Sequence, residues 1–330
     1  MTPTIFRSVE VHIGMSNLPR CARCGHTTET FSIRGELLCA ICFKKYVHTK
    51  VVKRLEANKI RGGYNETAKS ILVPISTGVS SLSLVHILNT QLQERSNNSK
   101  HPGYSLHLLF VVDKSSLCDE THPESIVTAL KEIYPSQELS VTLLQECFEY
   151  GVALDGIDSC DEISSSRSLD SVHRLNNLFA SAEDLSYRNE MEENIRGRLI
   201  DAFALRKGID TVFFGDTTTR LAERALTETA RGRGKNIPQL ITDSKTDSGL
   251  VHIFPLRDLL RKEVELYTSL TGSRLKALLD VSTPSVATPS SRNLSIDGLM
   301  QHYIENVEDN YPSIVANVVR TTSKLKAQEH

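Results

Sequence analysis

Short apolar runs separated by amphipathic stretches dominate the middle of the chain. Five such runs, rich in β-branched or aromatic residues, predict buried strands: 71–75, 106–112, 139–144, 210–214 and 249–256. Apolar side chains at helical spacing predict helices between and after them, at 82–88, 124–133, 174–208 with one break, 221–226, 257–267 and 295–324 with an interruption at Pro312. This alternation predicts an α/β fold with a doubly wound, mainly parallel sheet.

Small residues fill the junction between the first predicted strand and the helix after it. They let the backbone approach a ligand closely, and the start of the helix attracts an anion. We therefore expect a phosphate-bearing ligand here, although ordinary strand-to-helix turns also contain Ser, Thr and Gly. The candidate residues are Ser76, Thr77, Gly78, Ser80 and Ser81. Asp113 ends the strand 106–112, where it could contact a ribose or a metal, or be an ordinary loop carboxylate.

The strand 210–214 leads into a second candidate loop, which begins with Gly215 and Asp216 and precedes the helix 221–226. That helix ends in a run of cations between glycines, which suits a phosphate backbone or a solvated helix end. The cations are Arg231, Arg233 and Lys235. In contrast, residues 150–170 are acidic and Ser-rich, and we interpret them as a flexible insertion.

Near the N-terminus, four of the seven cysteines form two C-x-x-C pairs, Cys21/Cys24 and Cys39/Cys42. This spacing is typical of a zinc ribbon, in which two knuckles present four thiolates to one structural Zn²⁺. Disulfides or redox thiols are the alternatives. The remaining cysteines, Cys118, Cys147 and Cys160, form no C-x-x-C pair.

Directly after the second cysteine pair, residues 43–59 predict a strongly basic helix. Beside a zinc ribbon such a helix favours contact with nucleic acid, whereas alone it would be interpreted as a solvated face. Its candidate phosphate contacts are Lys44, Lys45, Lys50, Lys53 and Arg54.

The overall charge narrows the choice of partner. The chain has 38 Lys and Arg against 40 Asp and Glu, a formal charge of −2, so any nucleic-acid site has to be a local patch. It contains no apolar run near the roughly 18 residues of a membrane span, and its first residues do not resemble a secretory signal. We expect a cytoplasmic protein.

Together these motifs resemble the PP-loop ATP pyrophosphatases that thiolate tRNA. In that family a zinc ribbon precedes a domain whose first strand ends in S-G-G-x-D-S, and a later strand ends in a G-H/D loop before A-E-x-x-L and R-G. Here the first signature corresponds to residues 76–81, and the second to Gly215-Asp216, residues 221–226 and Arg231-Gly232. Over residues 21–267 the chain is similar to the cytoplasmic tRNA 2-thiolation protein 2 family.

The resemblance implies a degenerate nucleotide site. Its residues are Ser76, Thr77, Gly78, Ser80, Ser81, Asp113, Gly215 and Asp216. Active relatives have Gly and Asp where this chain has Thr77 and Ser80, which places ATP and Mg²⁺ binding in doubt. Active thiolases also carry a C-x-x-C inside the PP-loop domain, which this chain lacks, so we expect no catalytic residue and no iron–sulfur cluster.

The implied function is that of an accessory, non-catalytic subunit in the 2-thiolation of the wobble uridine (U34) of cytosolic tRNAs. It would form a heterodimer with a catalytic PP-loop paralogue and bind tRNA through its basic residues, and the sulfur would come from a thiocarboxylated ubiquitin-related modifier. Two alternatives stay open: an active ATP-dependent tRNA thiolase that tolerates the altered loop, and a zinc-ribbon nucleic-acid adaptor unrelated to thiolation. We expect a zinc ribbon with a basic helix at 1–62, a PP-loop-like domain at 63–272, and a linker with a helical segment at 273–330.

Overall fold

The computed structural model describes residues 19–60, 68–76, 78–98, 103–112, 122–152, 170–272, 279 and 295–325. The chain divides into two compact units, residues 1–49 and 50–330. The division falls inside helix α1 (Ala40–Ala57), ahead of the domain end at residue 62 that the sequence suggests. Most of the expected insertion at 150–170 and the expected linker at 273–294 lie outside the described residues.

The first unit is built on a hairpin of β1 (Thr30–Ile33) and β2 (Glu36–Cys39), which pair antiparallel with Thr30 opposite Cys39. Arg34 and Gly35 form its two-residue turn, with φ of 49° and 87°. Positive φ at both central residues matches the twist of a tight hairpin, and glycine adopts it without strain. Cys39 then leads directly into α1.

The second unit contains a six-stranded sheet in the order β5-β4-β3-β6-β8-β7. Its strands are β3 (Lys69–Ile75), β4 (Tyr104–Val112), β5 (Glu138–Leu143), β6 (Thr211–Phe213), β7 (Ser244–Lys245) and β8 (Val251–Ile253). All neighbours pair in parallel except β7 and β8. The expected mainly parallel α/β sheet is therefore confirmed, with β3 near its centre between β4 and β6.

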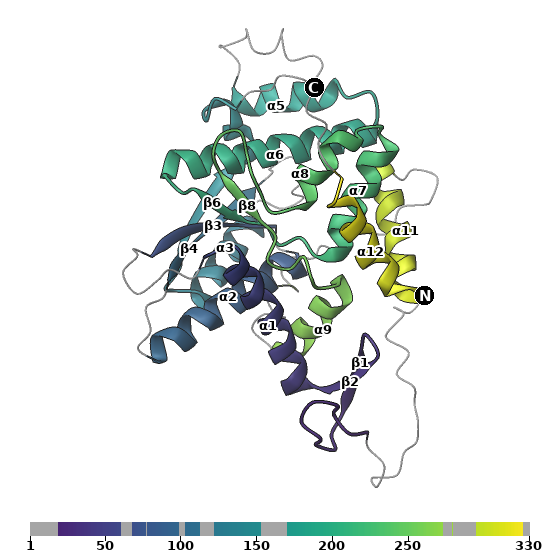
Figure 1. Cartoon of the computed structure of the whole chain (residues 1–330). Coiled ribbons are helices and arrows are strands. Elements are labelled where there is room, and N and C mark those ends of the chain that lie inside the picture. Colours follow the sequence, from purple (N-terminus) through teal and green to yellow (C-terminus); the bar gives the residue numbers. More distant parts are fainter. Residues whose placement is uncertain are drawn as a thin grey trace. The chain divides into compact units, whose positions relative to one another are not determined.

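Helices cover both faces of this sheet (Figure 1). α2 (Val79–Asn97) and α3 (His122–Ile133) lie on one side, and α5 (Ser171–Ala180) and α6 (Leu185–Lys207) on the other. Alternate strand residues face opposite sides, so the sheet contributes Leu72, Leu109, Val111 and Val212 to the core beneath α5 and α6. Between β5 and α5 lies a short 3₁₀ turn, η2 (Leu144–Phe148).

The remaining helices follow β6. They are α7 (Thr218–Ala230), a 3₁₀ turn η3 (Gly234–Asn236), α8 (Ile237–Ile241), α9 (Arg261–Thr271), α11 (Ile296–Asn310) and α12 (Pro312–Thr322). α11 and α12 pack against α7 through a core that includes Leu221, Ile304 and Val319. None of the helices in the described part of the chain combines the length and apolarity that a membrane span requires.

Two helix boundaries test the sequence pattern closely. The expected break within 174–208 is confirmed, because α5 ends at Ala180 and the carboxylate of Asp184 accepts a hydrogen bond from the Tyr187 amide at the start of α6. The expected helix start at residue 257 is wrong. Residues 255–258 form turns, and α9 begins only at Arg261, where Glu263 accepts a hydrogen bond from the Leu260 amide.

Candidate functional site

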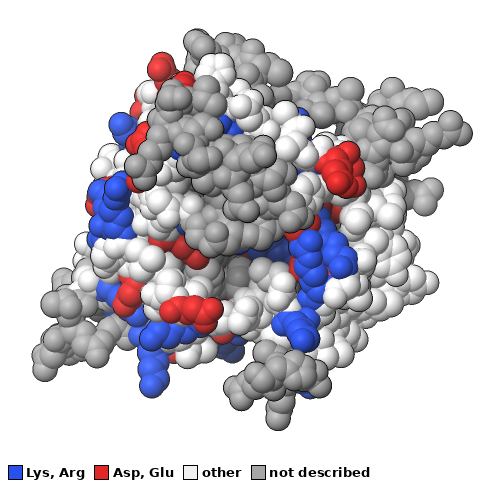
Figure 2. All heavy atoms as spheres, turned by 90° about the horizontal axis from the view of Figure 1, so that it is seen from above, with Lys and Arg blue, Asp and Glu red and all other residues white. Residues whose placement is uncertain are grey.

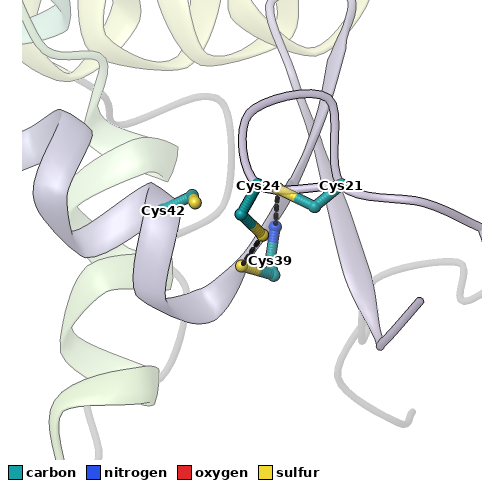
Figure 3. Close-up of side chains that lie close together, drawn as sticks. All are labelled: Cys21, Cys24, Cys39 and Cys42. Carbon is teal, nitrogen blue, oxygen red and sulfur yellow. Dashed lines mark hydrogen bonds between the residues drawn. The ribbon is translucent and has the colours of Figure 1, made fainter. Parts of the chain in front are cut away.

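The four N-terminal cysteines converge in the first unit (Figure 3). Cys21 and Cys24 come from the knuckle before β1, Cys39 ends β2, and Cys42 lies in the first turn of α1. Their sulfur atoms all lie within 4.8 Å of one another. Four thiolates around one tetrahedral ion at about 2.3 Å would lie about 3.8 Å apart. Because Cys24 Sγ and Cys39 Sγ are 3.7 Å apart, the donor set fits a single metal ion.

The backbone around Cys21 favours the thiolate form of that cysteine. Gly25, at a φ of 72°, closes the first knuckle by donating its amide to the Cys21 carbonyl at 2.9 Å. The amide of Cys39 donates to Cys21 Sγ at 3.3 Å. Backbone donation from Cys39, supported by the Cys24 amide, lowers the pKa of the Cys21 thiol to about 6. Metals bind the thiolate, so this hydrogen bond favours the ligating form.

In the second unit, a cavity of about 1030 Å³ opens at the carboxyl ends of β3, β4 and β6. This is where parallel α/β sheets usually bind ligands. Six of the eight residues expected at the nucleotide site line it: Ser76, Gly78, Ser80, Ser81, Gly215 and Asp216. The other two, Thr77 and Asp113, lie outside the described residues.

In the loop 76–81, the polar groups of Ser76, Gly78 and Ser81 form hydrogen bonds with one another. The Ser81 hydroxyl accepts from the Ser76 amide at 3.3 Å and donates to the Gly78 carbonyl at 3.1 Å. It also lies 3.3 Å from the Ser76 hydroxyl. Two groups that could meet a phosphate, the Ser76 amide and the Ser81 hydroxyl, are therefore already used to close the loop onto the start of α2.

The two glycines of the site differ in whether a side chain would fit at their position. A Cβ at Gly215 would lie 2.8 Å from Ser81 Cα and 3.0 Å from Ser81 N, so the loop after β6 packs directly on the first turn of α2. At Gly78 the φ is −74°, and a Cβ would meet only the Ser76 hydroxyl oxygen at 3.5 Å, an ordinary contact. Only position 215 depends on the absence of a side chain.

A chain of ion pairs crosses one wall of the cavity. Arg224 pairs with Asp216 at 2.7 Å and with Glu193 at 2.9 Å. Arg220 pairs with the same Glu193 at 3.3 Å and with Glu223 at 3.2 Å. Burial alone would raise the pKa of Glu193, but the positive charges of Arg224 and Arg220 outweigh it and keep that pKa below its usual value. Asp216 is thus engaged by an arginine.

The comparisons with known proteins agree with this architecture. The family model for cytoplasmic tRNA 2-thiolation protein 2 matches residues 295–330. A protein of that name from Pyrenophora tritici-repentis is 33% identical over 324 residues, covering 96% of this chain and 82% of the relative. Another from Phaeosphaeria nodorum is 35% identical over 315 residues, covering 93% and 80%. The chain belongs to the cytoplasmic tRNA 2-thiolation protein 2 family.

The fold is similar to that of a solved structure, the U34-tRNA thiolase NcsA from Methanococcus maripaludis with its [4Fe-4S] cluster. The two structures share a TM-score of 0.60 at 18% identity, and the alignment covers 95% of this chain and 91% of NcsA. This member of the thiolation protein 2 family therefore has the PP-loop type of fold that its motifs imply. The matched family segment includes α11 and α12, the helices that pack on α7.

Several basic residues expected to bind tRNA have partners within this family member. The Arg231 side chain is 9% exposed and pairs with Asp297 at 2.8 Å, Glu190 at 3.5 Å and Glu228 at 3.6 Å. Because its guanidinium is buried among three carboxylates, this geometry argues against Arg231 as a phosphate contact. It connects α6, α7 and α11 instead.

The other residues expected to bind phosphate are more accessible. Arg233 is half-exposed and pairs with Glu190, while Lys235 is exposed. On α1, Lys45 and Lys53 are exposed and Lys44 and Lys50 are partly exposed. Arg54 pairs with Asp243 at 2.8 Å and is 23% exposed. Among the described residues on the face in Figure 2, Lys and Arg lie interspersed with Asp and Glu, without a large patch of one sign.

The sequence did not indicate the wall formed by Glu193, Arg220 and Arg224. The sequence shows that Arg220 and Arg224 are four residues apart, so they lie on the same face of α7. Their shared partner comes from α6, and no local pattern connects it to them. Only the packing of α6 against α7 brings the three side chains together.

Proposed function

We propose that this chain is an accessory, non-catalytic subunit in the 2-thiolation of the wobble uridine of cytosolic tRNAs. Its membership of the cytoplasmic tRNA 2-thiolation protein 2 family supports the pathway. The accessory role is supported by the loop 76–81, which has Ser80 where active relatives have a carboxylate. Its partner would be a catalytic PP-loop paralogue, with which it would form a heterodimer in the cytoplasm.

In the proposed reaction the paralogue carries out the chemistry. The O2 atom of the uridine attacks the α-phosphate of ATP and pyrophosphate leaves. The sulfur of a thiocarboxylated ubiquitin-related modifier then attacks C2, and AMP leaves with the former uridine oxygen. Water finally cleaves the acyl–sulfur bond, which releases the modifier as its carboxylate and leaves the sulfur on C2. The present chain would hold the tRNA and its partner, with no step of its own.

The observation that carries this proposal is that the described carboxylate nearest the loop, Asp216, is already in an ion pair with an arginine. Active relatives place a carboxylate in the loop where this chain has Ser80. The next candidate, Asp216, is paired with Arg224 at 2.7 Å and is 16% exposed. Mg²⁺ prefers carboxylate oxygens, and an ion-paired carboxylate is a poorer ligand. Among the residues that the structure describes, the loop and its surroundings therefore offer a weak site for the metal that ATP activation requires.

An active enzyme is the second candidate, because a cavity of about 1030 Å³ lies where the nucleotide would bind. ATP-to-AMP turnover with unmodified tRNA distinguishes the two functions. We expect no AMP from this chain alone and faster AMP formation when it is mixed with the paralogue. AMP formed by the chain alone would support the enzyme, provided that Asp216→Asn abolishes it and so excludes a contaminating ATPase.

We propose zinc as the metal of the four-cysteine site, where it would hold the hairpin and the start of α1 together. The close sulfur spacing supports a single ion, since all four atoms lie within 4.8 Å of one another. A [4Fe–4S] cluster attaches each thiolate to a different iron, which separates the sulfurs more widely. The four-coordinate thiolate set is typical of structural zinc.

We also propose that the exposed and partly exposed cations bind the tRNA backbone. They are Lys44, Lys45, Lys50 and Lys53 on α1, with Arg233 and Lys235 after α7. Each cation bound to a phosphate releases counterions, so binding should weaken as salt concentration rises.

Reversing the charge of Lys50 and Lys53 to Glu tests this surface. We expect weaker tRNA binding at every salt concentration and a salt slope that is smaller by about 1 for each phosphate that is no longer neutralised, measured by filter binding between low and physiological salt. Lys131 on α3 and Lys245 on β7 are exposed lysines outside the proposed surface, and the same double reversal there is the control. Equal effects of the two double variants would show that only net charge matters.

A further inference from the structure

Arg257 is partly buried, and its guanidinium forms no hydrogen bond or ion pair with any residue that the structure describes. It lies in the turn that follows β8, where its amide donates to the Phe254 carbonyl at 3.1 Å. Its own carbonyl accepts from the Thr218 hydroxyl at 2.6 Å, so the backbone is fixed while the side chain is unpaired. A guanidinium carries a permanent positive charge and several N–H donors, which are therefore available to an anion here.

A second arginine lies close to it in the same unit. Arg54, near the end of α1, pairs with Asp243 at 2.8 Å, and its Nε is buried without a partner in the described part of the chain. Asp243 also accepts the amide of Phe254 at 3.0 Å, so this carboxylate connects α1 to the segment that carries Arg257. Burial and then the positive charge of Arg54 lower the pKa of Arg257, as expected where two cations are held near each other.

The described negative charge around the two arginines balances only one of them. Asp243 is 12% exposed, and its Oδ2 accepts from Arg54 and from the Asn58 side chain, each at 2.8 Å. Its Oδ1 accepts from the Phe254 amide. Asp258 is the other carboxylate whose charge acts on Arg257, but it is exposed, so water screens it. Among these residues, two guanidinium groups share one buried carboxylate and leave a positive charge in excess.

The charge and geometry of this place fit a phosphate group of RNA. A phosphodiester carries its negative charge on two free oxygens, to which arginine donates in a planar, paired geometry. Further cations lie beside Arg54. Lys50 is four residues before it on the same face of α1, and Lys53 and Lys59 are exposed. Repeated cations along one helix suit the repeated charges of a nucleic-acid backbone better than a single free anion.

We propose that Arg54 and Arg257 together bind one phosphate group of an RNA backbone, while Asp243 keeps Arg54 in position. The two guanidinium groups approach the phosphate from separate elements, the end of α1 and the turn after β8. This inference rests on the proposed tRNA binding and deepens it, because it adds Arg257, which does not belong to the basic helix. Unlike the lysines of α1, which offer point charges, the two arginines offer directed pairs of donors.

Filter binding of unmodified tRNA to Arg257→Met tests the proposal, since methionine keeps the unbranched stem and removes the charge. We expect the affinity to fall by about tenfold and the salt slope to decrease by about 1, because one charge-assisted contact with phosphate is lost. Arg206→Met is the matched control. The Arg206 guanidinium on α6 lies 4.3 Å from the centre of the Tyr150 ring and has no carboxylate partner among the described residues.

The control variant should bind tRNA within about twofold of the unaltered chain, because Arg206 lies on a different helix from the proposed site. Equal decreases in Arg257→Met and Arg206→Met would show an effect of net charge and overturn the proposal.

The double reversal of Lys50 and Lys53 separates this inference from the proposed tRNA function. Weaker binding in the double reversal with unchanged binding in Arg257→Met would overturn the arginine site and leave tRNA binding by α1 intact. If neither variant weakens binding, both proposals fail. Titration with inorganic phosphate and with a polyglutamate peptide tests other occupants. Loss of affinity for either ligand in Arg257→Met, at unchanged tRNA affinity, would overturn the assignment to RNA.

Thermal unfolding shows whether Arg257 serves binding or stability. Its guanidinium is partly buried in excess of the described counter-charge, so we expect Arg257→Met to unfold at the same temperature as the unaltered chain or at a higher one. A clearly lower midpoint would make Arg257 a structural residue and contradict the proposal. Arg257→Lys keeps the charge without the paired donors, and we expect about threefold weaker tRNA binding at an unchanged salt slope. Full affinity in Arg257→Lys would contradict the paired geometry.

Discussion

Replacing Cys39 with serine is expected to release the metal and unfold the first unit. Its hairpin has two strands of four residues each, too short to be stable without another constraint. Structural zinc sites contribute apparent binding energies of about 10–16 kcal/mol near neutral pH, and that energy is available only to the folded form. Metal analysis should find about one zinc per unaltered chain and almost none in Cys39→Ser, because a complete tetrahedral site needs all four thiolates.

The accompanying structural change can be followed by amide NMR. Signals from residues 19–39 should lose their dispersion in Cys39→Ser, while those of the six-stranded sheet should persist because the sheet belongs to the second unit. Cys147→Ser is the control, since Cys147 is a buried cysteine outside the cluster, and the metal content of this variant should be unchanged. Iron in place of zinc would contradict the proposed metal, and dispersed signals without metal would contradict its structural role.

Arg231→Ala is expected to lower the free energy of unfolding of the second unit by about 3–5 kcal/mol, the usual cost of removing one partner of a buried ion pair. The substitution leaves Asp297, Glu190 and Glu228 near one another without the guanidinium that pairs with all three. Those carboxylates come from α11, α6 and α7, so the substitution also weakens the attachment of the C-terminal helices. Urea denaturation followed by circular dichroism measures the effect.

Arg233→Ala provides the comparison. Arg233 pairs with the same Glu190, but its side chain is 44% exposed, so water can replace the missing guanidinium. The expected decrease in the free energy of unfolding is at most about 1 kcal/mol, as for other surface pairs. Similar decreases in the two variants would show that the Arg231 cluster is no stronger than an exposed ion pair. Recovery of stability in Arg231→Lys would show that charge alone maintains it.

The five parallel strands of the six-stranded sheet and most helices could be predicted because their signals are local. The apolar run at the centre of the sheet became β3, the run before Asp113 became β4, and the break near residue 182 separated α5 from α6. At the start of α9 the structure differs from the prediction, because this helix begins at Arg261 and not at residue 257. The helical spacing at 257–260 was overridden there because Arg257 and Leu259 donate their amides to Phe254 and Leu256 in turns.

The cysteine cluster was the part of the site most open to prediction. Ligand spacing in a zinc ribbon is set within about twenty residues of chain, so the pattern C-x-x-C predicted which thiols converge. The basic run after it predicted a cationic helix for the same local reason. Which of the cations have partners could not be predicted, because Asp243 and Asp297 are distant in the sequence from Arg54 and Arg231.

The sequence by itself determined the family, the alternation of strands and helices in the α/β domain, the cysteine cluster and the loops at the carboxyl ends of β3 and β6. Each of these depends on residue type and spacing over short stretches. The tertiary structure decided the chemistry of the cavity. It brought Glu193 from α6 to two arginines of α7 and paired Asp216 with Arg224. Charge pairing depends on distance in space, and distance along the chain does not reveal it.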